Sequence, residues 1–224
     1  MYLKVWLSLG SNLGDRIEYL RAGIKSLSRL SHLQIHQSPI YESAPWGGVA
    51  KGSFLNQVIA LTVDSERLDQ AINDLDPQKM IASHELDSEL WTKRMTFIHK
   101  CSGYRQVIEK LMFYLLLIEL SHGRNRNAHA VRWDSRTLDL DILFIEPNDP
   151  TSNPTGACLD RYNSLNQYNS PYLELPHPRL HERLFILAPW CDIAPLLYIQ
   201  SLKATVEELY KNCPQDSSLC IYVP

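Results

Sequence analysis

One stretch of the chain combines the pattern of a strand with two acidic residues, and this combination restricts how the chain can fold. From Thr137 to Phe144 the residues alternate in character, which predicts a strand whose successive side chains point to opposite faces. One face is expected to carry Thr137, Asp139 and Asp141, and the other Leu138, Leu140, Ile142 and Phe144. Because an uncompensated carboxylate in an apolar strand is costly, the two acids are expected to face a charged partner.

The chemistry of this stretch points to a polyphosphate. Residues two apart on a strand lie roughly 6.5–7 Å apart along one face, so Asp139 and Asp141 can reach a pair of hard cations and leave positions open for phosphate oxygens. Four arginines precede them and supply bidentate phosphate donors: Arg124, Arg126, Arg132 and Arg136. Guanidiniums this close repel one another, so we expect the segment to be mobile until an anion neutralises them. The alternatives are a solvated pair of surface acids and arginines that pair with surface carboxylates.

Composition limits the partners of the chain. Its 224 residues, 45% of them hydrophobic, suffice for one core, and the net charge of −3 argues against general binding of nucleic acid. Positive charge is local, around 124–136, so the expected partner is a small anion. Met1 leads directly into strand-like sequence, and the most apolar run, Leu111–Leu120, is short and carries Glu119. We therefore expect no targeting segment and no membrane span, and we predict a buried helix for this run.

The five cysteines form no CxxC pair and are odd in number. This usage favours reduced thiols, a cytoplasmic location and the absence of a structural zinc site. A monomer that acts on small molecules is expected.

The periodicity of the chain predicts elements in the order β-α-β-β-α-β. Strands are expected at 2–9, 33–41, 56–63 and 137–145, and helices at about 20–30, 65–75, 104–120 and 205–211. Asn12 or Asp15 is a candidate cap for the first helix. This order is typical of an α+β fold, a ferredoxin-like βαββαβ sandwich, here with extra C-terminal elements.

Two stretches do not fit that order and are predicted to be insertions in a single domain that spans 1–224. Residues 77–102 mix charges and show no clean apolar period, so we expect them to add little to the core. Residues 146–170 are rich in Asn, Pro, Ser and Thr, and are expected to form a long mobile loop. Further on, Pro189 is expected to break a helix that begins at Leu184.

A loop rich in Pro, Gly and aromatic residues lies between two of the predicted strands, from Glu42 to Phe54. It contains Pro45-Trp46-Gly47-Gly48. Such a loop can form a wall for a flat ring. The alternative is that Trp46 and Phe54 are core residues.

With these residues in place, the chain resembles the 6-hydroxymethyl-7,8-dihydropterin pyrophosphokinase family of folate biosynthesis. Four blocks carry the resemblance in the right order: LSLGSNLGDR at 7–16, YESAPWGG and GSFLNQVIAL within 41–61, GRNR, RW and RTLDLDI within 123–142, and LPHPRL and ERLF within 175–189. The chain departs from the family where Asp134-Ser135 replaces the usual Gly-Pro. The resemblance implies a ferredoxin-like fold, ATP as the donor and two Mg²⁺ ions.

The resemblance also implies roles for individual residues. Asp139 and Asp141 would hold the two Mg²⁺ ions, and the catalytic residues would be Arg124, Arg136, Asp139 and Asp141. The ATP site would comprise Arg124, Arg126, Arg132, Trp133, Arg136, Ile142, His177 and Arg183. The pterin site would comprise Ser43, Ala44, Pro45, Trp46, Phe54, Asn56 and Phe185. Of these, Phe54 and Phe185 would lie on either side of the ring and Asn56 at its edge.

The implied reaction is a displacement by the hydroxymethyl oxygen on the β-phosphorus of ATP, with AMP as the leaving group. A Mg²⁺ ion on that hydroxyl would lower its pKa, so no side-chain base is required. Two other classes share part of this pattern. A two-metal nucleotidyl transferase or phosphodiesterase would use the same aspartates without the aromatic loop. An RNA-binding sheet would need exposed aromatics on central strands and a basic face, which the net charge disfavours.

Overall fold

The computed structural model describes residues 1–47, 50–84, 88–124, 134–147, 167–216 and 218–223. Its helices are α1 (Arg16–Ser28), α2 (Ser65–Asp74), α3 (Pro77–Ser83), α4 (Ser88–Lys100), α5 (Gly103–Ser121), α7 (Leu184–Ile193) and α8 (Val206–Asn212), with the short 3-10 turn η1 (Leu180–Glu182). Its strands are β1 (Tyr2–Ser11), β2 (His36–Gln37), β3 (Tyr41–Ser43), β4 (Phe54–Asp64), β5 (Asp139–Pro147), β6 (Tyr168–Asn169), β7 (Glu174–Leu175), β8 (Tyr198–Ile199), β9 (Ala204–Thr205) and β10 (Cys220–Ile221).

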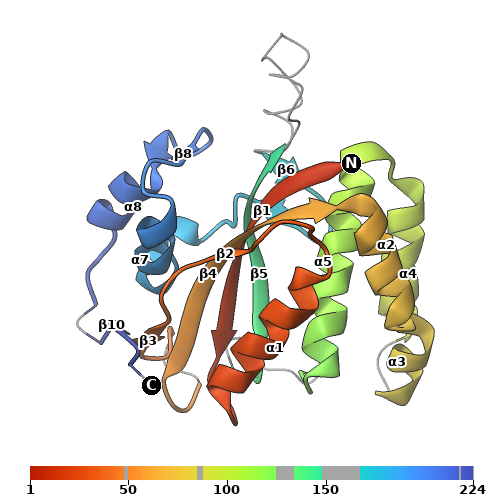
Figure 1. Cartoon of the computed structure of the whole chain (residues 1–224), viewed down its shortest axis with the longest axis horizontal. Helices are drawn as coiled ribbons and strands as arrows, with labels where there is room; N and C mark the ends of the chain where they lie inside the picture. The colour runs from red at the N-terminus through yellow and green to blue at the C-terminus, as the bar shows by residue number, and fades with distance from the viewer. Residues whose placement is uncertain (48–49, 85–87, 125–133, 148–166, 217, 224) are drawn as a thin grey trace.

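An antiparallel sheet occupies the middle of the molecule, with the strand order β10-β3-β4-β1-β5 and β2 beside β4 (Figure 1). The long partners β1 and β4 pair over most of their lengths, from Tyr2 opposite Asp64 to Ser11 opposite Leu55. The first and third predicted strands are therefore confirmed and are slightly longer than expected. Gly10 and Ser11 belong to β1, which therefore continues beyond the predicted end at residue 9.

The second predicted strand, 33–41, is wrong over most of its length. Only the short strands β2 and β3 pair with β4 in this part of the chain. Pro39 stands between them and has no N–H to donate to a ladder. Ser38 makes the connection instead, since its backbone N donates to the carbonyl of Val58 at 2.9 Å and its hydroxyl accepts from the N of Val58 at 3.1 Å.

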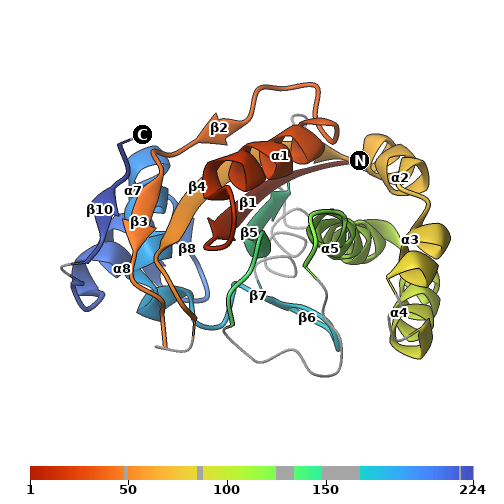
Figure 2. The ribbon, with the colours of Figure 1, turned by 90° about the horizontal axis from the view of Figure 1, so that it is seen from below.

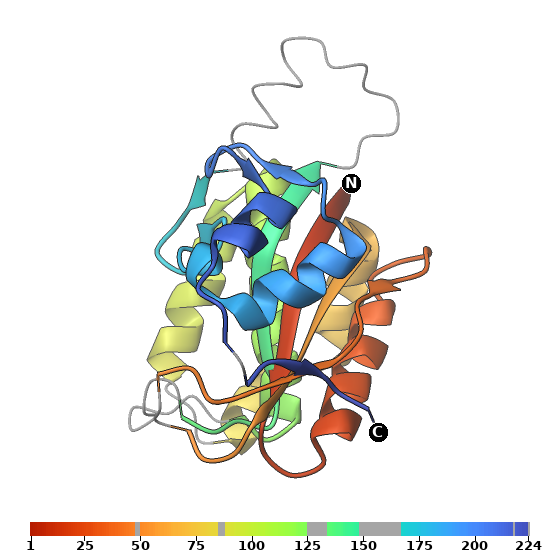
Figure 3. The same cartoon turned by 90° about the vertical axis from the view of Figure 1, so that its left-hand side faces the viewer.

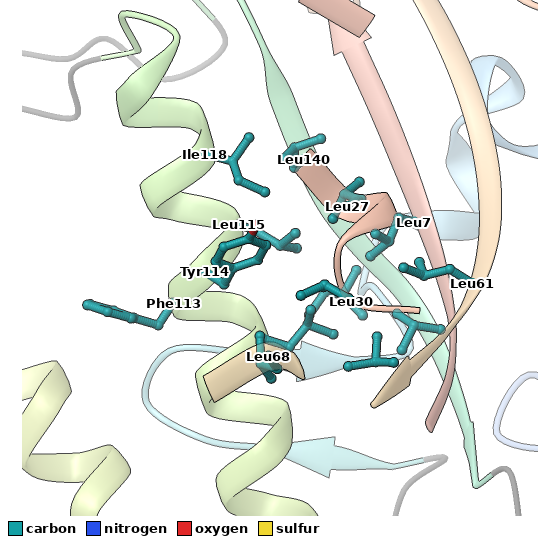
Figure 4. Packing of buried hydrophobic residues seen from close by; sticks show 14 of the residues in the cluster. Leu7, Leu27, Leu30, Leu61, Leu68, Phe113, Tyr114, Leu115, Ile118 and Leu140 are labelled. Atoms are coloured by element: carbon teal, nitrogen blue, oxygen red, sulfur yellow. The ribbon is translucent and has the colours of Figure 1, made fainter. Parts of the chain in front are cut away.

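One face of the sheet is covered by α1 and α5 and forms the larger core (Figure 4). Leu27 of α1 and Leu115 of α5 meet the apolar side chains of β1, β4 and β5 in this cluster, and both are almost fully buried. The hydroxyl of Tyr114 donates to the carbonyl of Ser26 at 3.1 Å and links the two helices. The buried helix predicted for the apolar run 111–120 is confirmed.

Helices α7 and α8 cover part of the opposite face (Figure 3). Trp190 of α7 and Trp6 of β1 are buried there, with ring centroids 5.8 Å apart. Pro189, predicted to break the helix, lies inside α7, so that prediction is wrong. The missing N–H removes one helical hydrogen bond, and burial of the apolar side chains around it outweighs this loss. The last predicted helix is confirmed as α8, which begins with a capping box made by Thr205 and Glu208.

An irregularity in β5 changes the face on which its later residues lie. The register with β1 shifts between Trp6 and Leu7. Phe144 pairs with Trp6, and Ile142 pairs with Leu7, which leaves Leu143 as the extra residue. Ile142 stays in the core under α5, whereas Leu143 and Phe144 both join the cluster under α7. The prediction that Phe144 shares a face with Ile142 is wrong, because a bulge interrupts the alternation of a strand.

The described part of 77–102 contains the helices α3 and α4, which lie beside α5 at one side of the molecule (Figure 2). Ile98 is 3% exposed and belongs to the core, and Trp91 meets Phe113 edge-on with ring centroids 5.5 Å apart. The prediction that this stretch adds little to the core is therefore wrong. Trp91, Met95 and Ile98 recur at helical spacing, but many charged neighbours hide this signal in so short a helix.

The long loop predicted for 146–170 is wrong at both ends, because β5 continues to Pro147 and Tyr168–Asn169 form β6. Its expected mobility concerns residues 148–166, which lie outside the described part of the chain. The chain then returns through the two-stranded β6–β7 sheet. None of the helices in the described ranges has the length and apolar character needed to span a bilayer.

Candidate functional site

One face of the sheet is covered only in part, and its open part forms the floor of a pocket. Under α7 this face carries Trp6, Val58 and Phe144. Further along the same strands the alternate residues become small or polar: Ser8, Gly10, Asn56, Asp139 and Asp141. The strand register places Asp141 opposite Ser8, and Gly10 between Asp139 and Asn56. The described residues that line the pocket are Ser8, Gly10, Ser43, Ala44, Trp46, Phe54, Asn56, Arg136, Asp139, Asp141, Arg183 and Phe185.

Asp139 is held by two arginines that approach from different segments. Arg124, just after α5, donates through Nη1 to Oδ1, and Arg136 donates to Oδ2 at 2.8 Å. Burial lowers the pKa of Arg124, but the charges of Asp139 and Glu119 outweigh it, and the pKa is raised overall. The protein itself therefore neutralises Arg124 and Arg136, and the predicted repulsion between unpaired guanidiniums is wrong for these two.

Glu119 is part of this cluster and was missed by the sequence reasoning. Its carboxylate is 1% exposed at the end of α5. It accepts from Nη1 of Arg124 at 2.6 Å and from the backbone N of Leu140 at 2.8 Å, so it ties α5 to β5 between the two aspartates. The available signal was one carboxylate in an apolar helical run, since a buried carboxylate needs a charged or hydrogen-bonding partner.

A second charged group surrounds Asp141. Arg183, which precedes α7, places Nη1 3.7 Å from Oδ2 of Asp141 and 3.4 Å from Nε2 of His177. Its Nε is buried and makes no hydrogen bond to any residue that the structure describes. Burial lowers the pKa of Arg183, and the charges of Asp141 and Asp139 act against this shift. A buried guanidinium with an unused donor is suited to an anionic ligand.

The position of His177 depends on the bulge in β5. Its backbone N donates to the carbonyl of Leu143, the extra residue, at 3.0 Å. Its Nδ1 accepts from the backbone N of Arg179 at 3.3 Å, so a neutral ring carries its proton on Nε2. Burial and the charge of Arg183 lower the pKa of His177 to about 4, and the ring is therefore neutral at pH 7.

The other half of the pocket is aromatic. Phe54 begins β4, Phe185 lies in the first turn of α7, and Trp46 stands on the loop between β3 and β4. The guanidinium of Arg136 lies 5.8 Å from the ring centroid of Phe54, and that of Arg183 lies 5.9 Å from the ring centroid of Phe185. The charged half and the aromatic half therefore meet at these two arginines.

The amide of Asn56 lies between the two halves, on the floor. Its Nδ2 donates to the hydroxyl of Ser43 at 2.9 Å, and both residues are buried. This bond fixes the orientation of the amide across two adjacent strands. A flat heterocycle with donors and acceptors at its edge needs such a fixed polar partner.

Asn12 joins three loops around the pocket. Its Nδ2 donates to the carbonyl of Lys51 and to the hydroxyl of Ser135, both at 3.1 Å, and its Oδ1 accepts from the backbone N of Arg136 at 2.7 Å. Ser135, one of the two residues that replace the family's usual Gly-Pro, therefore helps to anchor the segment that carries Arg136. Of the two candidate caps, Asp15 caps α1.

The structure brings most of the predicted site residues together. Those that line the pocket are Ser43, Ala44, Trp46, Phe54, Asn56, Arg136, Asp139, Asp141, Arg183 and Phe185. Arg124 and His177 contact charged members of that set. Pro45 is absent from the lining, and the side chain of Ile142 lies in the core on the other face of the sheet. Arg126, Arg132 and Trp133 lie outside the described residues.

Asp139 and Asp141 are the lining residues whose oxygens suit a hard cation such as Mg²⁺. Among the described residues, no group of three or more His, Cys, Asp and Glu side chains could hold a metal ion. A cation here would therefore need additional oxygens from a ligand or from water, and it would compete with the arginines for the carboxylates. The donor set fits a metal that arrives together with phosphate oxygens.

Carboxylates and guanidiniums beside an aromatic half-pocket define a class of site in which a phosphorylated donor meets a flat acceptor. The chain belongs to the 7,8-dihydro-6-hydroxymethylpterin-pyrophosphokinase family, whose model matches residues 6–76 and 61–195. The match includes the floor of the pocket, the aromatic loop and the segment from His177 to Phe185.

Curated relatives agree with this assignment. The 2-amino-4-hydroxy-6-hydroxymethyldihydropteridine pyrophosphokinase of Mycobacterium tuberculosis is 30% identical over 192 residues, which cover 86% of this chain and 73% of the relative. The enzyme of the same name from Porphyromonas gingivalis is 28% identical over 194 residues, which cover 87% and 92%. Among solved structures, the chain is similar to Plasmodium falciparum HPPK-DHPS with STZ-DHP at 11% identity and a TM-score of 0.48, over 94% of this chain and 43% of that one.

Proposed function

We propose that the pocket floored by Asp139, Asp141 and Asn56 is the active site in which this chain carries out the reaction of its family. The chain transfers pyrophosphate from ATP to the hydroxymethyl group of hydroxymethyldihydropterin, a step of folate biosynthesis. The observation that supports this location best is the meeting of a charged and an aromatic half in a single pocket.

The aromatic half would hold the pterin. Its flat faces would pack between Phe54 and Phe185, beside Trp46, because aromatic rings bury large apolar area at low conformational cost. The amide of Asn56, fixed by the hydroxyl of Ser43, would pair with the polar edge of the ring. Analogues that lack this edge would leave a buried amide unpaired, which is expensive, so the edge would determine specificity.

The charged half would hold the triphosphate. Arg183 offers its buried Nε, and neutral His177 offers its Nε2 proton, to phosphate oxygens. Arg124 and Arg136 already converge on Asp139, and they would shift their hydrogen bonds toward the transferred group as negative charge develops on it. Asp139 and Asp141 would hold two Mg²⁺ ions. When bound, these ions would screen the triphosphate and lower the pKa of the acceptor hydroxyl.

An assay that follows AMP formed from ATP and 6-hydroxymethyl-7,8-dihydropterin tests this function. We expect AMP only when ATP, pterin and Mg²⁺ are all present, and none when EDTA replaces the metal. AMP formation that does not depend on the pterin would indicate a nucleotide hydrolase and would overturn the assignment.

We further propose that 1–224 forms one pyrophosphokinase domain of ferredoxin-like topology, with 77–102 and 146–170 as insertions. The order of β1, β4 and β5 with α1 and α5 on one face supports this topology. We also propose a monomer that acts on small molecules in the cytoplasm, without nucleic acid or membrane partners. Of the five cysteines, the four in described positions are free thiols, which is compatible with a reducing compartment.

A further inference from the structure

Arg16 is the first residue of α1 and ends the block 7–16, for whose residues the resemblance implied no individual roles. A cation at the start of a helix is disfavoured, because the positive end of the helix dipole lies there. The side chain of Arg16 is 26% exposed and contacts the loop between β3 and β4. Its position therefore serves that loop rather than the stability of its own helix.

A single nitrogen of Arg16 joins the two ends of this loop. Nη1 donates to Oε1 of Glu42 at 2.7 Å, and to the hydroxyl and the carbonyl of Ser53 at 2.9 and 3.0 Å. The hydroxyl of Ser53 donates in turn to the same Oε1 at 2.5 Å. The hydrogen bonds from Ser53 and Arg16 lower the pKa of Glu42, so its carboxylate is charged at pH 7. Arg16, Glu42 and Ser53 together form a loop clasp.

The loop clasp lies directly beside the aromatic half of the pocket. Glu42 precedes Ser43 and Ser53 precedes Phe54, and the register of β3 and β4 places Ser43 opposite Phe54. The hydroxyl of Ser43 also accepts the hydrogen bond that orients the amide of Asn56. None of the three clasp residues is among the described residues that line the pocket. The clasp would therefore act on a ligand only through its neighbours.

Strand β3 is short enough to need such support. It has three residues, and short terminal pairings are among the first to open locally. The clasp opposes opening beside Ser43, because it ties both limbs of the loop to α1. On the other side of β3, β10 pairs with Tyr41 and Glu42, so β3 is expected to stay in the sheet when the clasp is removed. Loss of the clasp should disturb the pocket wall rather than the fold.

We propose that Arg16 is a positioning residue for pterin binding, because its clasp keeps Ser43 and Phe54 in the geometry that the ring requires. The inference rests on the proposed function, since it takes the aromatic half as the pterin site. Asn12, rather than the clasp, joins this loop to the segment that carries Arg136. The affinity for ATP alone should therefore not depend on Arg16.

Calorimetric titration of the pterin into Arg16→Met, with a non-hydrolysable ATP analogue and Mg²⁺ present, tests the proposal. We expect the dissociation constant for the pterin to rise roughly three- to tenfold, because a partly exposed network of charge-assisted hydrogen bonds is lost. The affinity for the analogue alone should change by less than about twofold. In turnover, KM for the pterin should rise while kcat stays close to that of the parent protein. Arg16→Lys, which keeps the charge but not the guanidinium, should restore part of the loss.

Further variants separate this role from a general structural one. Ser53→Ala removes only the shared hydroxyl and should cause a smaller loss of the same kind, so it carries the test if Arg16→Met folds poorly. Glu42→Gln combined with Arg16→Met should lose less pterin affinity than the two single losses predict, because both substitutions act on one network. Arg21→Met removes an exposed arginine of α1 that pairs with Glu18, and it should change the affinity for neither ligand.

The proposal has clear ways to fail. Pterin affinity equal to that of the parent protein in both Arg16→Met and Ser53→Ala would overturn it. Equal losses for the pterin and the analogue, or independent effects of Arg16→Met and Glu42→Gln, would overturn it as well. Absence of AMP formation or of pterin binding in the parent protein would instead count against the proposed function, which keeps the two failures apart.

Discussion

The two halves of one sheet face differ in polarity although they share the same three strands. Under α7 the face is apolar, with Trp6, Val58 and Phe144 packed on Trp190. The same face carries polar or small residues toward the pocket, two residues further along β1 and β4 and three residues further along β5, where the bulge adds one residue. The difference is that a helix covers one half and a ligand would cover the other.

This contrast shows how stability and activity are separated within one sheet. Side chains under α7 gain their stabilisation from permanent burial. Those on the pocket floor keep their charges only because they neutralise one another, as Arg124, Arg136 and Asp139 do. Substitutions in the covered half should therefore change the free energy of unfolding, whereas substitutions in the open half should change turnover or ligand affinity.

The largest expected effect lies in the covered half. Phe144 is fully buried, so Phe144→Ala should lower the free energy of unfolding by about 3–5 kcal/mol. Phe144→Leu keeps most of the volume and should cost about 1 kcal/mol. Urea denaturation measures both, and turnover per folded molecule of Phe144→Leu should match the parent protein. Phe185→Ala, in the open half, should destabilise less, and an equal loss would remove the contrast between the halves.

The next largest effect concerns the charged floor. Asp139→Asn and Asp141→Asn should each lower turnover by roughly 10²–10³-fold while the fold is retained, because each removes a charge placed for the reacting phosphates. Single-turnover kinetics at saturating Mg²⁺ measures the loss. The matched control is Glu146→Gln, an acid of the same strand that pairs with Trp6 and Lys4 away from the pocket. Near-normal turnover of either aspartate variant would contradict the metal assignment.

A third effect is the pH dependence of the free energy of unfolding that His177, beside the pocket, is expected to cause. The pKa of His177 is about 4 in the fold, below the ordinary 6.5, because of burial, the charge of Arg183 and, more weakly, that of Arg179, with Asp139 acting in the opposite direction. Between pH 6.5 and 4, His177 binds a proton in the unfolded chain but not in the folded one. The contribution of neutral His177 to the free energy of unfolding is therefore fully present above pH 6.5 and is lost as the pH falls to 4. Its full size is about 3 kcal/mol.

Urea denaturation at pH 7, 5.5 and 4.5 checks this expectation. The parent protein should lose more stability over this range than His177→Gln, which lacks the titrating ring. His181→Gln, at an exposed position of the same segment, serves as the control and should follow the parent protein. Parallel losses in the parent protein and His177→Gln would show that the histidine is not held neutral.

A smaller effect is expected at the aromatic walls. Phe54→Ala and Phe185→Ala should weaken pterin binding more than ATP binding, since stacking adds roughly 0.5–1.5 kcal/mol beyond the burial of area. Calorimetry with each ligand separately gives both affinities. Equal losses for the two ligands would mean that the rings do not enclose the pterin.

The smallest effect is expected at Gly10, which lies between the two halves of the pocket. A Cβ at this position would meet Asp139, Asn56 and Phe54 at 3.7–3.9 Å, which is ordinary contact, so Gly10→Ala should fold with little loss of stability. The added methyl would rise from the floor toward the ring and should weaken the pterin by a few-fold, on the order of 1 kcal/mol. Thermal unfolding and pterin titration test this pair of expectations. A large loss of stability would show that the floor is packed as tightly as the covered half.

Local sequence by itself determined much of this protein. The alternation of side-chain character predicted β1, β4 and the start of β5, with Asp139 and Asp141 on one face. A two-residue period leaves few alternatives to a half-buried strand. The apolar run of α5 predicted its own burial. The family-specific sequence blocks then implied the residues of the charged and aromatic halves of the pocket. Most of those that the structure describes line one pocket.

Only the tertiary structure decided how these parts meet. The bulge at Leu143 moves Phe144 under α7 and supplies the carbonyl that positions His177, and local alternation cannot reveal an extra residue that depends on a partner strand. Glu119 became part of the site only because the end of α5 lies against β5. Arg179 reaches Trp46 across more than a hundred residues of chain. Such contacts depend on how separate elements pack, since no local period relates the residues that make them.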